Sequence, residues 1–131
     1  MDKHITVFKA LSDKTRLRIA YLLSSSKTEL CVCEIVDSLE IPQYNVSRHL
    51  KIMKKAGLVS EVKAGKWVRY EINSDGTFRG ALLTTLLTLP TAIFRKELME
   101  LKKRFSIRIK GKCLLGIQKK HLIGKKDERR K

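Results

Sequence analysis

Two cysteines, Cys31 and Cys33, stand one residue apart in a stretch with the composition of a helix. Thiolates bind soft metal ions and metalloids, so this pair forms part of a candidate site for a thiophilic ligand. On a regular helix, residues i and i+2 lie roughly 200° apart around the axis. Both sulfur atoms can therefore face one ion only if the helix begins at this point or unwinds there. The plainer interpretation is that both cysteines are small buried hydrophobes.

A trivalent arsenical prefers three thiolates arranged as a pyramid, and this pair provides only two. The remaining thiol is Cys113, which would come from the same chain or from a partner. Lys110 and Lys112 beside it would lower its pKa and make it reactive. Two interpretations stay open for Cys113, a third ligand or an incidental cysteine in a basic tail.

A second candidate site begins ten residues further on. Val46, Leu50 and Met53 are spaced i, i+4 and i+7, which predicts a helix at residues 43–56 with one buried stripe. Gly57 is a typical helix stop. The opposite face is polar and basic, as a helix that reads the major groove requires. The predicted DNA contacts on this helix are Gln43, Tyr44, Asn45, Ser47, Arg48, His49 and Lys51. For His49, a phosphate contact and plain exposure are equally good interpretations.

A hairpin is predicted after this helix. Residues 58–63 and 67–72 alternate between apolar and polar side chains, and Ala64-Gly65 forms the turn. A basic hairpin that follows a helix-turn-helix is typical of a wing that contacts phosphates or the minor groove. The predicted DNA contacts on the hairpin are Lys63, Lys66 and Arg69.

The remaining elements complete a winged helix-turn-helix. We expect three earlier helices at residues 4–11, 13–23 and 28–39, with Ser12 and Thr28 as N-caps. Ile5, Phe8 and Leu11 would form the apolar face of the first. Residues 78–101 are rich in leucine and are divided by Pro90, with apolar faces too wide for a helix covered on one side. This pattern predicts a symmetric dimer interface. The expected fold is therefore mainly α with a small β-hairpin, in a homodimer.

The charge is unusual for a chain of 131 residues: 29 Lys and Arg against 13 Asp and Glu give a net +16. Such an excess predicts a polyanionic partner, nucleic acid or less often an anionic membrane surface. Residues 102–131 hold 13 of the basic and 2 of the acidic residues. We therefore expect a DNA-binding and dimerisation domain at residues 1–101 and a basic, flexible tail at residues 102–131.

Location and catalysis are constrained mainly by missing features. The N-terminus does not resemble a secretory signal, and no apolar stretch reaches the ~20 residues of a membrane span. An odd number of cysteines with so close a pair favours free thiols in a reducing cytoplasm. The sequence has no glycine-rich phosphate loop, no Ser/His/Asp set and no paired catalytic carboxylates. We expect a cytoplasmic protein that is not an enzyme, requires no cofactor and does not bind membranes.

The run ELCVCE at residues 29–34 resembles the ELCVC-(D/E) motif of arsenic-responsive members of the ArsR/SmtB family of winged-helix metalloregulators. Gln43 with VSRHL at residues 46–50 is similar to the family's reading helix, AGLV at residues 56–59 to its end, and GKWVRY at residues 65–70 to its wing. The resemblance covers residues 4–101. In three places the chain departs from the pattern: Val36 stands where some members have a third cysteine, Pro42 stands where serine is usual, and the basic tail with Cys113 is not a feature of the family.

The resemblance implies a homodimeric repressor that leaves its double-stranded operator DNA when As(III) or Sb(III) binds. By family pattern the ligands are Cys31 and Cys33, and the DNA contacts are Gln43, Tyr44, Ser47 and Arg48. Zinc-sensing members use histidine and acidic residues on the last dimer helix. Residues 78–101 contain no histidine, which argues against such a site here.

Three alternatives stay open. The same fold could sense Cd(II) or Pb(II), although the relatives that do so typically have N-terminal cysteines and this chain has none before Cys31. It could sense thiol oxidation through a disulfide between Cys113 and Cys31 or Cys33. A third possibility is a basic nucleic-acid-binding protein that senses nothing and whose cysteines are structural.

Overall fold

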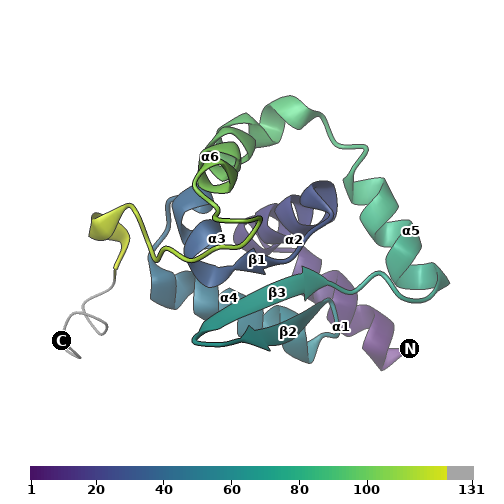
Figure 1. The fold of residues 1–131 in the computed structure, drawn as a ribbon. Helices are drawn as coiled ribbons and strands as arrows, with labels where there is room; N and C mark the ends of the chain where they lie inside the picture. The colour runs from purple at the N-terminus through teal and green to yellow at the C-terminus, as the bar shows by residue number, and fades with distance from the viewer. Residues whose placement is uncertain (124–131) are drawn as a thin grey trace.

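The computed structural model describes residues 1–123 and shows helices packed around a small antiparallel sheet (Figure 1). The elements in chain order are α1 (Asp2–Leu11), α2 (Lys14–Ser26), β1 (Leu30–Cys31), α3 (Val32–Leu39), α4 (Gln43–Lys55), β2 (Val59–Ala64), β3 (Trp67–Ile72), α5 (Thr77–Leu86), the 3-10 turn η1 (Thr91–Phe94), α6 (Arg95–Ser106) and the 3-10 turn η2 (Lys120–Leu122). The sheet order is β1-β3-β2. The predicted winged helix-turn-helix, mainly α with a small hairpin, is confirmed.

The helix-turn-helix consists of α3 and α4. The predicted stripe of α4 is correct, because Val46, Leu50 and Met53 are all fully buried. Gly57 follows the helix with φ +79°, a left-handed conformation that glycine adopts without the strain of a side chain. The turn before α4 contains a second left-handed residue, Glu40, with φ 56°.

The wing is the hairpin of β2 and β3, which pair from Val59 opposite Ile72 to Ala64 opposite Trp67. The third strand was not expected. Leu30 and Cys31 pair with Tyr70 and Arg69 of β3, so the residues just before α3 are extended. The expectation of a helix from Thr28 is therefore wrong, and α3 begins only at Val32.

The N-terminal helices differ from expectation in two details. Asp13, not Ser12, is the N-cap of α2, and its carboxylate accepts a hydrogen bond from the Arg16 backbone N–H at 3.0 Å. In α1 the buried residues are Val7 and Ala10. Of the three predicted apolar residues, Ile5 and Phe8 lie outward, 42% and 51% exposed, while Leu11 is partly buried against the core.

Pro90 divides the leucine-rich stretch as predicted, because α5 ends at Leu86 and the chain turns by 85° before it continues into α6. The second half packs within the chain: Phe94 stacks on Tyr21 at a ring distance of 3.8 Å, and Leu101 is buried. Phe94 and Leu101 are therefore not available to a dimer interface, whereas Ile93 and Met99 of the same stretch are exposed, and the symmetric dimer interface stays a prediction. No single helix among residues 1–123 is long and apolar enough to cross a membrane. Only the bent pair formed by α5 and residues 91–106 has sufficient length and composition.

Helix α6 continues to Ser106, so the predicted domain boundary after Leu101 falls inside a helix. The next residues, 107–123, are called the C-terminal segment below. It lies across α3 and α6 and buries the side chains of Cys113, Ile117 and Leu122 (Figure 1). As far as residue 123 the structure thus differs from the expected flexible tail. The rest of the predicted tail, residues 124–131, lies outside the described residues.

Candidate metal centre and DNA interface

Three thiols meet in one buried cluster. The sulfur atoms of Cys31, Cys33 and Cys113 all lie within 4.8 Å of one another, and those of Cys33 and Cys113 are 3.4 Å apart. All three cysteines are free and at most 7% exposed. Cysteine is the only type of ligand in this cluster. The arrangement therefore suits a soft ion that accepts three sulfur donors.

The start of α3 explains how Cys31 and Cys33 face the same side. Cys31 has φ −74° and ψ 153°, which is extended, and it is the N-cap rather than part of the helix. The spacing of a regular helix therefore does not apply to the pair, and no unwinding is required. The buried carboxylate of Glu34 accepts a hydrogen bond from the Cys31 backbone N–H at 3.0 Å and fixes this geometry.

Arg108 helps hold the C-terminal segment, which contains Cys113, against the start of α3. Its Nε and Nη2 donate to the two carboxylate oxygens of Glu34, both at 2.8 Å. Nη2 also donates to the carbonyl oxygen of Glu29 at 2.9 Å. A bidentate pair of this kind is among the stronger polar contacts in proteins. The carboxylate that shapes the Cys31-Cys33 turn thus also anchors the segment that carries the third thiol.

A second arginine, Arg104 of α6, lies against the sulfur atoms. Its Nη2 is 3.3 Å from the sulfur of Cys113 and 3.6 Å from that of Cys33, while Nη1 donates to Asp37 at 2.5 Å. The backbone N–H groups of Gln118 and Lys119 also donate to the Asp37 carboxylate, at 2.9 and 3.1 Å. Arg104 and Asp37, both nearly fully buried, therefore tie α6, α3 and the C-terminal segment together around the thiols.

The pKa values of the three thiols are shifted in different directions. Hydrogen bonds from Cys31 and Cys33 lower the pKa of Cys113, and the guanidinium of Arg104 acts in the same direction. The neighbouring Cys113 sulfur and burial raise the pKa of Cys31 and of Cys33. The neighbouring thiols and Arg104 therefore favour the deprotonated form of Cys113 over that of Cys31 or Cys33. The lowered pKa agrees in direction with the prediction, but its causes are the other thiols and Arg104 rather than adjacent lysines.

Sequence reasoning missed the four charged residues that build this centre, Glu34, Asp37, Arg104 and Arg108. A signal was present, because two acidic residues interrupt the otherwise apolar helix α3. Carboxylates in so apolar a helix are expected to be buried and therefore paired with cations. The sequence does not show which of the many basic residues after position 101 provide those partners.

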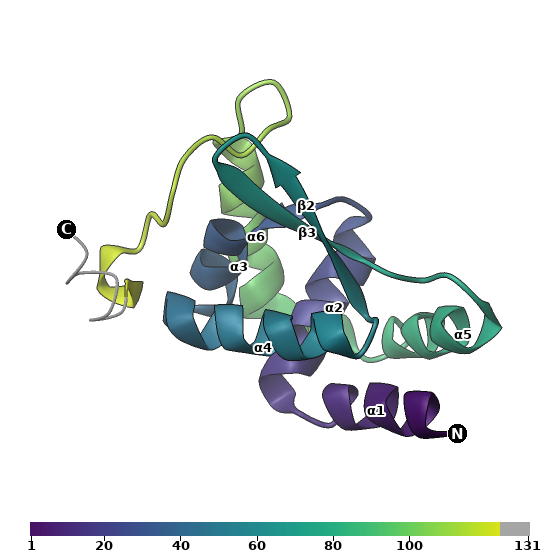
Figure 2. The same cartoon turned by 90° about the horizontal axis from the view of Figure 1, so that it is seen from below.

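The predicted DNA contacts fall mostly on one face. On α4, Tyr44, Ser47, Arg48 and Lys51 are exposed, and Gln43 and Asn45 are half-buried. On the hairpin, Lys63 and Lys66 are exposed. Figure 2, a view from below, shows α4 and the hairpin spread across this side of the molecule. We call this face the reading face, defined by these eight residues.

Two predicted contacts lie elsewhere. The His49 side chain is 11% exposed and its Nδ1 is 3.0 Å from Nη1 of Arg16, because it packs between α4 and α2. Burial lowers the pKa of His49. Arg69 is half-buried and lines a small cavity beside Cys113. Both residues are therefore placed apart from the reading face, and their contact with DNA stays a prediction.

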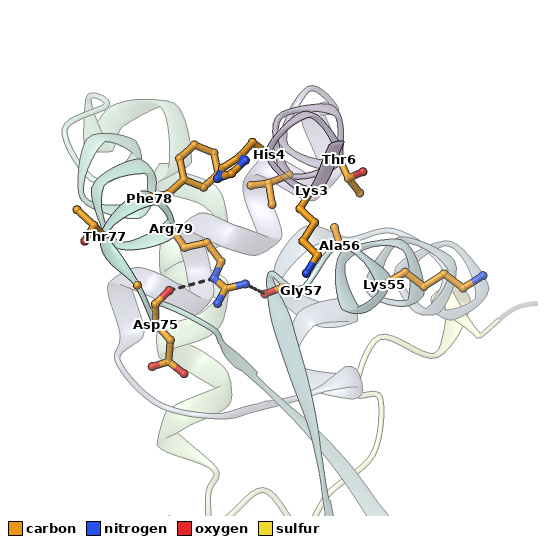
Figure 3. A pocket seen from close by; sticks show the side chains of 12 residues that line it. Lys3, His4, Thr6, Lys55, Ala56, Gly57, Asp75, Thr77, Phe78 and Arg79 are labelled. Atoms are coloured by element: carbon orange, nitrogen blue, oxygen red, sulfur yellow. Dashed lines mark hydrogen bonds between the residues drawn. The ribbon is translucent and has the colours of Figure 1, made fainter. Parts of the chain in front are cut away.

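A cavity of about 510 Å³ lies between α1, the end of α4 and the start of α5, away from the thiols (Figure 3). The ring of Phe78 there meets His4 and Phe8 edge-on, at centroid distances of 4.6 and 5.4 Å. Arg79 donates to the carbonyl oxygens of Asp75 and Gly57, at 3.1 and 3.4 Å. The ring contacts join α1 to α5, and Arg79 joins α5 to Gly57 after α4. Ile5 and Phe8 of α1 stay exposed.

Comparison with known proteins identifies the family. Residues 13–61 match the family model described as bacterial regulatory protein, arsR family. The arsenical resistance operon repressor of Bacillus subtilis strain 168 is 37% identical over 97 residues, which cover 74% of this chain and 87% of that protein. The chain belongs to the ArsR family. Members of this family are transcriptional regulators that bind DNA through a helix-turn-helix, so the expectation of a protein that is not an enzyme agrees with this membership.

Other relatives of this ArsR-family chain are named for different roles. The uncharacterized HTH-type transcriptional regulator MJ1325 of Methanocaldococcus jannaschii is 46% identical over 74 residues, 56% of this chain and 82% of that protein. The cadmium resistance transcriptional regulatory protein CadC homolog of Staphylococcus aureus is 44% identical over 69 residues, 53% of this chain and only 56% of that protein. The structure of reduced HlyU from Vibrio cholerae N16961 superposes with a TM-score of 0.59 at 30% identity, covering 68% of this chain and 92% of that one.

Proposed function

We propose that this ArsR-family regulator is a repressor that releases its operator DNA when As(III) or Sb(III) binds Cys31, Cys33 and Cys113 of the same chain. The observation that carries the proposal is the buried cluster of three sulfur atoms within 4.8 Å of one another. The donor set fits the ligand, because three thiolates complete the coordination of a trivalent ion and no oxygen donor is needed. One arsenous acid and three thiols give the trithiolate complex and three water molecules.

Binding would act on DNA through α3. Three bonds to one ion would draw Cys31 and Cys33, at the start of α3, and Cys113 to a common centre. Helix α3 packs directly against α4, which carries most of the reading face. A ligand that favours one placement of α3 therefore changes the population of the DNA-binding arrangement, and the coupling free energy is reciprocal.

The regulator would act as a homodimer through α1 and α5. Ile5 and Phe8 of α1 are 42% and 51% exposed, and Leu87 at the end of α5 is 38% exposed. A second copy would cover these apolar side chains by a two-fold interface and place two reading faces over a palindromic operator. This interface keeps the first half of the predicted leucine-rich stretch and leaves α6 within the monomer.

A second candidate input is thiol oxidation, because the sulfur atoms of Cys33 and Cys113 lie only 3.4 Å apart. Operator release separates the inputs when As(III), Cd(II) and hydrogen peroxide are titrated against the same DNA complex. The proposal expects release by As(III) near one equivalent per chain and at lower concentration than Cd(II). Unchanged DNA affinity with As(III), together with release by peroxide, would instead support oxidation as the input.

Arg48→Ala is expected to weaken operator binding about 5- to 150-fold, the ~1–3 kcal/mol that a base-reading arginine contributes. Arg48 is exposed on α4, and its Nη2 lies 3.5 Å from Asn45 Oδ1. Affinity should be measured by fluorescence anisotropy on operator and on random duplexes at one salt concentration. The loss on random DNA should be much smaller. An equal loss on both would assign Arg48 to phosphate contact instead.

A further inference from the structure

The thiols are buried, so the ligand needs a route to them. A groove of about 470 Å³ reaches Cys31 and Cys33 from the surface. We call it the thiol groove. Its walls include Gln43 and Ser47 of α4, Trp67 of the wing and Gly116 of the C-terminal segment.

The thiol groove lies beside the reading face. Two of its lining residues, Gln43 and Ser47, are reading-face residues of α4, and Lys66, beside Trp67, is at the hairpin turn. The C-terminal segment closes the third side, since a Cβ on Gly116 would lie 3.8 Å from the Trp67 ring. Figure 2 shows the segment passing the hairpin turn toward the N-terminal end of α4. The groove therefore opens between the two elements that would touch DNA.

We propose that As(III) reaches the thiols through the thiol groove and that bound operator closes this route, so that the ligand is captured only by DNA-free repressor. The inference rests on the proposed function for the identity of the ligand and the DNA face. Duplex DNA that contacts both α4 and the wing must lie across the space between them. Release by As(III) would then trap protein that has already dissociated, rather than eject it from DNA.

A second cavity, of about 110 Å³, borders Cys113 and is lined by Arg69, Arg108 and Glu29. It is smaller, reaches only one of the thiols and is dominated by charged groups. Arsenous acid is uncharged at neutral pH and gains little from such a lining. In the thiol groove it meets two thiols. Exchange at the first forms one S–As bond and releases one water, and two further exchanges complete the site.

The direct test is the rate of release. Repressor bound to fluorescent operator is mixed rapidly with increasing As(III), and in parallel with excess unlabelled operator. As As(III) is increased, the rate of operator release should level off at the spontaneous dissociation rate that is measured with unlabelled operator. The ratio of the two rates should then be one. A rate that continues to rise above the spontaneous rate would overturn the proposal. Absence of release at any time would instead count against the proposed function.

A variant at the groove tests the route independently. Gly116 has no left-handed φ, and an added Cβ makes only ordinary contact at 3.8 Å from the Trp67 ring, so the larger side chain of Gly116→Leu starts without backbone strain and extends into the groove. Thermal unfolding checks that Gly116→Leu is folded, and Gly116→Ala, which adds only this Cβ, is the milder second variant. The matched control is Thr28→Leu, at the edge of the smaller cavity. As(III) uptake by DNA-free protein is followed by the ultraviolet absorbance of the S–As bonds. Its rate should be about tenfold lower in Gly116→Leu, since association rates among variants of one binding site vary by ~1–3 decades. The final absorbance should be unchanged. Slower uptake only in Thr28→Leu, or equal rates in all three proteins, would overturn the route.

Discussion

A Cys33→Ser variant is expected to bind operator as tightly as the wild-type protein and to keep it bound at As(III) concentrations that release the wild type. The Cys33 sulfur lies 3.4 Å from that of Cys113, and like it faces Arg104 and the Leu115 carbonyl oxygen. A serine hydroxyl keeps those polar partners, so the fold should survive. It is a hard oxygen donor, however, and does not replace a thiolate for a soft ion.

The companion variants give an ordered series. Cys31→Ser should behave like Cys33→Ser, while Cys113→Ser should still respond but require at least about tenfold more As(III), a loss of 1.4 kcal/mol or more. Operator release by anisotropy measures all three, with thermal unfolding of the ligand-free proteins as the control for folding. An unchanged response in both Cys31→Ser and Cys33→Ser would contradict every sensor hypothesis for these thiols.

Arg104→Met is expected to destabilise the protein by ~3–5 kcal/mol, the usual cost of leaving one partner of a buried ion pair uncompensated. Among residues 1–123, Asp37, 2% exposed, would then keep the two backbone N–H groups of Gln118 and Lys119 as its partners. Because small domains are stable by only ~5–15 kcal/mol, such a loss is a large fraction of the total. The measurement is the urea dependence of the circular dichroism signal, with and without As(III).

A double variant separates charge from packing. Arg104→Met with Asp37→Leu removes both charges and should recover part of the lost stability, as apolar replacements of buried pairs often do. The variant Lys103→Met is the matched control on the same helix, since Lys103 is exposed and pairs only with Glu100. A loss below 1 kcal/mol in Arg104→Met would show that this arginine does not hold the segment in place.

Local patterns in the sequence predicted the local structure well. The stripe of Val46, Leu50 and Met53, the stop at Gly57 and the alternation of the hairpin each depend on neighbours within a few residues. The short strand β1 was missed because two residues show no periodicity, and its conformation is set by pairing with β3, almost 40 residues later. That same strand is what removes Cys31 from the helix.

The sequence could not predict that Cys113 joins Cys31 and Cys33, because this too depends on contacts between distant residues. Cys113 reaches α3 because Arg104 pairs with Asp37 and Arg108 with Glu34, partners separated by 67 and 74 residues. With 13 basic residues after position 101, charge alone does not select these two. Composition predicted a flexible tail, whereas two buried ion pairs and three buried side chains dock residues 107–123.

We expect Cys31, Cys33 and Cys113 of one chain to bind one trivalent ion together. X-ray absorption spectroscopy at the arsenic edge, on the repressor loaded with one equivalent of As(III), measures this coordination. We expect three sulfur neighbours and no oxygen in the wild type, and two sulfurs with one oxygen in Cys113→Ser. An identical coordination shell in both proteins would contradict a site completed by the C-terminal segment.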